Sequence, residues 1–108
     1  MRRNKYGNKR VKLDGYSFES KAEARYYGEM KLLEQAHIIS GLVVHPKYPI
    51  VYKGTKVCVV ELDFEYCDAD GVIHFVDVKG QYLPMSRLKH KLFKAFYGEE
   101  VTIVRDKR

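Results

Sequence analysis

The sequence of 108 residues has no tryptophan, three prolines and only two cysteines. Cys58 and Cys67 alone cannot supply a four-ligand metal site, so we expect both to be ordinary reduced thiols. No apolar run approaches the roughly 18 residues that a membrane-spanning helix requires. The basic N-terminus also has no apolar segment of the kind that marks a secretion signal. We therefore expect a cytoplasmic protein without a membrane partner.

Acidic residues are missing from the first 12 positions, which hold six basic residues: Arg2, Arg3, Lys5, Lys9, Arg10 and Lys12. A second basic group occupies a helix-like segment near the C-terminus and consists of Arg87, Lys89, Lys91 and Lys94. The net charge is +6, and the acids gather in the middle of the chain. Basic flanks around an acidic centre suit a polyanion held at its edges. A soluble basic protein with a disordered arm and a solvated helix face explains the charges equally well.

The length and composition indicate one globular domain preceded by an arm. Apolar residues make up 45% of the chain, with nine tyrosines and five phenylalanines. This content is typical of a folded domain of common size. Residues 1–15 are polar, basic and interrupted by glycine, so we interpret them as an arm that ends in a turn at Asp14-Gly15. The domain is then expected over residues 16–108.

The first regular element is predicted to be a helix from about Lys21 to Ala36. Ser20 is followed three positions later by Glu23, the spacing of a capping box. Apolar residues behind it recur at helical spacing and form one face: Ala22, Tyr26, Met30 and Leu33. Glu23 is therefore either a helix-start residue only or a functional side chain.

Strand-like segments fill the middle of the chain. Residues 38–44 are apolar and β-branched before prolines interrupt them, and residues 48–66 then predict a strand, a Lys53-Gly54 turn and a long second strand. Val72–Lys79 predicts a third strand. A helix follows, with an apolar stripe of Leu88, Leu92, Ala95 and Phe96 and an end at Gly98, and a short strand from Val101 to Val104 comes last. The expected fold is α/β in the order α-β-β-β-α-β: an antiparallel meander covered by helices, with the final strand added after a crossover.

The loop between the second and third strands decides which charges meet. A three-residue loop, Ala69 to Gly71, sets Asp63 opposite Asp77 and places Glu61 opposite Lys79. A two-residue loop shifts this register and moves Asp63 to the other side of the sheet. Carboxylates paired across strands repel unless they stay in bulk water, share a proton or share a cation. The alternation of acids at 61, 63 and 65 also fits the solvated face of a half-buried sheet.

Glu23 on the helix, Asp63 on a strand and Asp77-Val78-Lys79 on the next strand resemble the PD-(D/E)XK nuclease superfamily. The stretches "GYSFESKAEARYY" and "LDFEY…FVDVKGQY" look like the small phage-borne branch of that superfamily, including Holliday-junction resolvases. The resemblance covers about residues 16–105 and implies a restriction-endonuclease-like core with a mixed central sheet flanked by helices. One departure is Leu62, which stands where that family's motif has proline.

The resemblance implies a role for each matching residue. Asp63 and Asp77 would ligate Mg²⁺, which Mn²⁺ could replace, together with the backbone carbonyl of Val78. Glu23 would approach the ion directly or through a water. Lys79 would orient the nucleophile or stabilise developing negative charge. His45 stands where a polar residue sometimes supports the site, and a loop histidine without a role is the alternative.

The implied function is a Mg²⁺-dependent endodeoxyribonuclease, in its most specific form a resolvase of branched DNA that cuts two strands as a homodimer. The two basic groups would hold the DNA backbone without reading its sequence. The alternative function is a DNA-binding module without catalysis that uses the same basic surfaces. A structural or partner-binding protein with a wet acidic strand face is the third interpretation.

Overall fold

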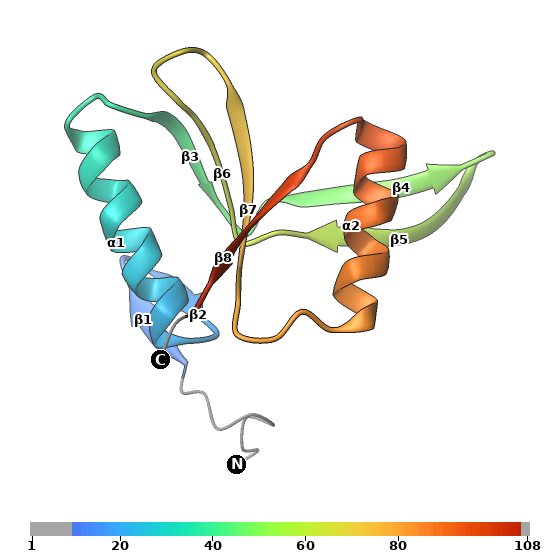
Figure 1. The fold of residues 1–108 in the computed structure, drawn as a ribbon, viewed down its shortest axis with the longest axis horizontal. Helices are drawn as coiled ribbons and strands as arrows, with labels where there is room; N and C mark the ends of the chain where they lie inside the picture. The colour runs from blue at the N-terminus through green and yellow to red at the C-terminus, as the bar shows by residue number, and fades with distance from the viewer. Residues whose placement is uncertain (1–9, 107–108) are drawn as a thin grey trace.

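The structure of the protein is a computed structural model that describes residues 10–106 (Figure 1). Within this range the chain forms two helices and eight strands. In chain order these elements are β1 (Val11–Leu13), β2 (Tyr16–Phe18), α1 (Lys21–Gln35), β3 (Ser40–Val44), β4 (Lys47–Tyr52), β5 (Thr55–Glu61), β6 (Phe64–Cys67), β7 (Ile73–Lys79), α2 (Pro84–Tyr97) and β8 (Val101–Arg105).

The centre of the fold is a four-stranded mixed sheet in the order β3-β6-β7-β8. The β3–β6 and β6–β7 pairs are antiparallel, whereas β7 and β8 are parallel. Helix α2 connects these parallel strands, as a crossover between parallel neighbours requires. The predictions of an α/β fold, a mixed sheet and a last strand added after a helical crossover are therefore confirmed.

The two faces of the central sheet pack against different parts of the chain because side chains alternate along a strand. Val76 of β7 belongs to a core with Phe64 of β6 and residues of β2 and α1. Phe75, its neighbour in sequence, packs instead on a second core that contains Phe93 of α2. The second core extends onto the separate β4–β5 hairpin, which projects away from the central sheet beneath α2 (Figure 1).

The register of the β6–β7 hairpin agrees with the three-residue loop. Phe64 pairs with Val76 and Cys67 pairs with Ile73, which continues to Asp63 opposite Asp77. Gly71 has φ of +84°, the left-handed conformation that this loop needs and that glycine adopts without strain.

The long strand expected to end at Tyr66 is interrupted, and this interruption makes one prediction wrong. β5 ends at Glu61, and β6 begins at Phe64 in a different sheet. Glu61 consequently pairs with Lys47 of β4 and does not lie opposite Lys79, which pairs with Arg105 of β8.

Three further strands, β1, β2 and β3, are absent from the predicted element order. Residues 11–13, assigned to the basic arm, form β1 and pair with β2 around the Asp14-Gly15 turn. Residues 40–44 form β3 at the edge of the central sheet. β1 and β2 have only three residues each, too few to show an alternating pattern, whereas the apolar and β-branched composition of residues 38–44 agrees with a strand. Residues 1–9 of the arm lie outside the described residues.

The remaining expectations on α1, the turns and the cysteines agree with the structure. α1 begins after Ser20, whose Oγ accepts a hydrogen bond from the Glu23 N–H at 3.1 Å. Lys53 and Gly54 form the turn between β4 and β5. Cys58 and Cys67 are free thiols. Neither helix in residues 10–106 is long and apolar enough to cross a membrane.

The buried face of α2 differs from the predicted stripe. Leu88 and Phe96 are 51% and 42% exposed, whereas Phe93 is fully buried. The helix carries apolar residues on more than one side, and the packing of β4 and β5 selects the side that includes Phe93 and His90. The helix ends as predicted at Gly98, which has φ of +74°.

This assignment of the helix face predicts different costs for two phenylalanine substitutions. Phe93→Ala should lower the free energy of unfolding by about 3–5 kcal/mol because it leaves a cavity in a packed core. Phe96→Ala should lower it by about 1 kcal/mol or less because Phe96 is partly exposed. Urea denaturation of both variants measures the difference, and equal losses would contradict the assignment.

Candidate metal and catalytic site

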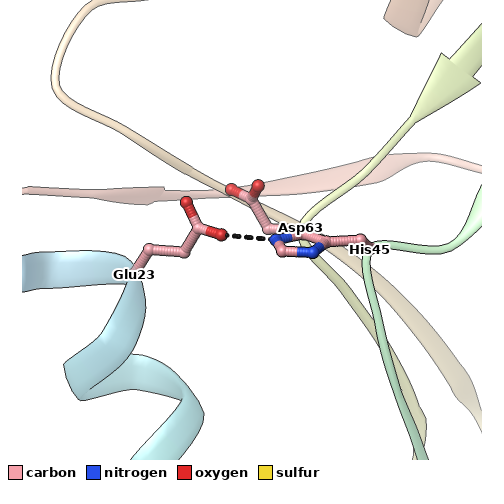
Figure 2. Close-up of side chains that lie close together, drawn as sticks. All are labelled: Glu23, His45 and Asp63. Atoms are coloured by element: carbon pink, nitrogen blue, oxygen red, sulfur yellow. Dashed lines mark hydrogen bonds and ion pairs between the residues drawn. The ribbon is translucent and has the colours of Figure 1, made fainter. Parts of the chain in front are cut away.

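Side chains from one helix and three neighbouring parts of the sheet converge where β3 ends, β6 begins and α1 starts. Figure 2 shows Glu23 of α1 pointing toward His45, which follows β3, and Asp63, which precedes β6. Asp77 and Lys79 lie at the adjacent end of β7. The structure therefore brings together all four predicted catalytic residues and adds His45.

The break between β5 and β6 places the Asp63 carboxylate. Leu62 is fully buried, and its N–H donates to the Pro46 carbonyl at 3.0 Å. The Asp63 carbonyl accepts a hydrogen bond from the His45 N–H at 2.9 Å. The loops before β4 and before β6 are thus joined through their backbones, which fixes Asp63 beside His45.

Asp63 and Asp77 are joined by two hydrogen bonds that run in opposite directions across the strands. The Asp63 backbone N–H donates to Asp77 Oδ1 at 2.9 Å, and the Val78 backbone N–H donates to Asp63 Oδ2 at 2.7 Å. Each carboxylate therefore accepts an amide hydrogen from the other residue's strand segment. These amide hydrogens offset part of the repulsion between the two carboxylates.

Burial and charge raise the pKa of Asp63 to about 8. Loss of solvent is the largest cause, and the negative charges of Glu23 and Asp77 add to it. The Val78 N–H and the positive charge of Lys79 oppose the rise. Glu23 is also buried, and its pKa is raised by the loss of solvent although its hydrogen bond to His45 lowers it. The site therefore concentrates more negative charge than its own donors neutralise.

Lys79 lies two residues beyond Asp77 on the same face of β7. Its Nζ is 3.8 Å from Asp77 Oδ2, and its side chain is 26% exposed. The ammonium group is thus close to the carboxylates and still open to solvent.

His90 of α2 is a site residue that sequence reasoning missed. Its Nε2 lies 2.6 Å from Asp77 Oδ2, and its Nδ1 lies 2.7 Å from the Tyr82 hydroxyl. An ionised carboxylate only accepts, so Nε2–H donates to Asp77, and the other nitrogen of a neutral imidazole accepts the Tyr82 O–H. His90 lies three residues before the buried Phe93 and therefore on the same side of α2. The apolar stripe predicted from the sequence placed the buried side of α2 elsewhere, and His90 was therefore not identified.

His45, for which the sequence leaves a supporting role and no role both open, is part of the cluster. An unusual backbone conformation directs its side chain there. Its φ is +54°, in the left-handed region that histidine tolerates better than most residues. Its ring lies 5.7 Å from the ring of the buried Phe18, and its Nε2 is 2.9 Å from Glu23 Oε1. The imidazole is thereby held between a packed aromatic ring and a buried carboxylate.

Glu23, His45 and Asp63 form a group whose donor atoms all lie within 4.8 Å of one another. Among residues 10–106 it is the one such group of three or more Asp, Glu, His or Cys side chains. Asp77 is not a member. The Val78 N–H bonds to Asp63, and because the N–H and C=O of one strand residue point to the same side, the Val78 carbonyl also faces that side of β7. Two carboxylates, an imidazole and a carbonyl fit a divalent cation.

Three of the predicted DNA-binding residues in the described range have partners outside this cluster. Arg10 forms an ion pair with Glu19 at 3.1 Å, and Arg87 stacks over the Tyr82 ring at 5.1 Å. Lys94 pairs with Glu100 at the surface. Lys12 and Lys91 are exposed, Lys89 is half-buried, and Arg2, Arg3, Lys5 and Lys9 lie outside the described residues.

The fold and this site define a small mixed α/β domain that carries a partly buried cluster of carboxylates and histidines. The chain belongs to the family described as "Protein of unknown function (DUF1064)", whose sequence model matches residues 3–107. No curated protein and no solved structure matches the chain.

The raised pKa of Asp63 predicts a pH-dependent gain in stability for Asp63→Asn in metal-free protein. The pKa of Asp63 in the folded protein lies above its ordinary value of 3.8. The protonated carboxyl therefore makes its full contribution to the stability of the fold at low pH, and this contribution is lost as the pH rises through about 8. Asparagine stays neutral and still accepts the Val78 N–H. At pH 9 the variant should exceed the wild type by on the order of 1 kcal/mol or more.

Thermal unfolding at pH 5 and pH 9 measures this gain, which should be smaller at pH 5. Asp70→Asn, an exchange of the same kind at an exposed loop position, is the control. A gain at Asp63 that is equal at both pH values would contradict the prediction.

Proposed function

We propose that this protein is a metal-dependent endonuclease that hydrolyses DNA phosphodiester bonds, built on the restriction-endonuclease-like core of the PD-(D/E)XK superfamily. The observation that carries the proposal is the convergence of four side chains from α1, the residue before β6, and β7: Glu23, Asp63, Asp77 and Lys79. The order of α1, the β5-to-β7 strands, α2 and β8 also supports it, together with the mixed sheet.

Mg²⁺ is the proposed ion, with Mn²⁺ as a substitute, and the residues present fit it. Asp63, Asp77, the Val78 carbonyl and Glu23 would hold it, since oxygen donors are those that Mg²⁺ prefers. When bound, such an ion neutralises negative charge on a phosphate and activates water. The crossed hydrogen bonds between Asp63 and Asp77 keep these carboxylates oriented before any ligand arrives.

Lys79 supplies the positive charge on the solvent side of the cluster. Its Nζ lies near Asp77 but remains partly exposed, so it can contact a phosphate oxygen and stabilise the negative charge that develops during hydrolysis. His90 holds Asp77 from the opposite side and is a positioning residue. The basic arm and the cations of α2 would bind DNA phosphates without reading bases.

Cleavage assays test the proposal. The protein is incubated with Mg²⁺ or Mn²⁺ and a four-way junction, a linear duplex or a single strand. The wild type should cut DNA, the junction best, and Lys79→Ala should cut about 100-fold more slowly or worse because it lacks the charge that stabilises the transition state. Lys56→Ala, which removes an exposed lysine of the β4–β5 hairpin, should leave the rate unchanged.

A wild type that cuts none of the three substrates with either ion would refute the enzyme, and DNA binding without cutting would favour the non-catalytic binding module. Equal cutting of all three would reject only the preference for branched DNA.

We further propose that the active form is a homodimer, because symmetric cutting of two strands of a junction requires two active sites related by a two-fold axis. Light scattering on the full chain should give twice the monomer mass. A monomer at the concentrations that give paired cuts would contradict the dimer.

A further inference from the structure

We infer that Glu23, His45 and Asp63 bind one divalent first-row transition metal ion and that the His45 nitrogen makes this site prefer Mn²⁺ to Mg²⁺. The inference deepens the proposed function and rests on it in one respect, since both take the Glu23 and Asp63 carboxylates as part of the metal site. It differs by adding a nitrogen ligand outside the carboxylate and lysine set.

The donor atoms already stand close to the spacing that one ion imposes. For metal–oxygen distances of about 2.1 Å, neighbouring ligands in an octahedron are about 3 Å apart and opposite ligands about 4 Å. His45 Nε2 and Glu23 Oε1 are 2.9 Å apart, and all three donor groups lie within 4.8 Å of one another (Figure 2). Small side-chain rotations are therefore enough to bring the three onto one centre.

Each donor is supported by contacts that do not involve the ion. Glu23 sits in the first turn of α1 behind the Ser20 cap. His45 is fixed by its backbone hydrogen bond to Asp63 and by the Phe18 ring. Asp63 is held by the Val78 N–H. A site built on such supports loses little freedom when it binds, which favours affinity.

The charge balance also calls for a cation at this position. Two carboxylates meet here, with Glu23 buried and Asp63 half-buried beside the His45 ring. One divalent ion with two carboxylates and a neutral imidazole is electrically neutral. Asp77, a ligand in the proposed Mg²⁺ set, is not one of the three clustered donors, and its two oxygens face the Asp63 N–H and His90.

The nitrogen ligand gives the preference. Mg²⁺ is a hard ion that selects oxygen and gives up water reluctantly, whereas first-row transition ions accept imidazole and bind mixed nitrogen and oxygen sites more tightly. Mn²⁺ is the weakest binder of the transition series, so a preference for Mn²⁺ over Mg²⁺ is the most demanding form of the test.

Metal titration of the full chain without DNA tests the preference. Free Mn²⁺ is followed by its electron paramagnetic resonance signal, and Mg²⁺ affinity is obtained by competition. Wild type should bind Mn²⁺ at least about tenfold more tightly than Mg²⁺. His45→Asn should weaken Mn²⁺ binding by about tenfold or more and Mg²⁺ binding much less. Asparagine suits the left-handed backbone at this position.

His37→Asn is the matched control, because His37 has a similar φ of +61° and lies at the other end of α1. It should leave both affinities unchanged. Equal weakening of Mn²⁺ and Mg²⁺ in His45→Asn would show that His45 only orients Glu23 and would overturn the inference.

Pulsed resonance on the Mn²⁺-loaded wild type gives a readout that needs no variant to fold. Coupling between the Mn²⁺ electron spin and a directly bound imidazole nitrogen is expected. Its absence would overturn the inference. Coupling that survives in His45→Asn and disappears in His90→Asn would also overturn it. A protein that shows the His45 coupling but cuts no DNA would refute only the proposed nuclease. Cutting with no nitrogen coupling would refute only the His45 ligand.

Discussion

The hydrogen bond from the Asp63 backbone N–H to Asp77 Oδ1 is the contact on which the rest of the site depends. The chain leaves the β4–β5 hairpin at Leu62 and enters the central sheet at Phe64. The amide of the residue between them lies beside β7 and donates both to Asp77 Oδ1 at 2.9 Å and to the Val76 carbonyl at 3.1 Å. Together with the Val78 N–H on Asp63, it turns a repulsive pair of carboxylates into a fixed one. The cluster of Glu23, His45 and Lys79 then assembles around that pair.

The parts of the fold that the sequence predicted well are those governed by local chemistry. Gly71 allowed a three-residue loop as one of two possible β6–β7 registers, and the structure adopts that register. The Ser20 cap gave the start of α1. The parts that failed depend on contacts between distant residues. Nothing local shows that the strand breaks at Leu62, because the break follows from a hydrogen bond to Pro46.

The same distinction separates the predicted site residues from the missed ones. Asp63 and Asp77 lie on the two arms of one hairpin, so their separation in the sequence and the loop length determine that they face each other. His90 reaches Asp77 from α2, and its position depends on which of several apolar helix sides is buried, a choice made by β4 and β5. His45 depends on a positive φ that no pattern in its neighbourhood announces.

The left-handed backbone of His45 has a consequence for how this position can change over generations. Outside glycine, the residues that tolerate such a backbone most readily are asparagine, aspartate and histidine. All three carry an oxygen or nitrogen donor at short reach. Substitutions compatible with this backbone are therefore those whose side chains can still face Glu23 and Asp63. The backbone of one loop residue thus limits the chemical character of the cluster.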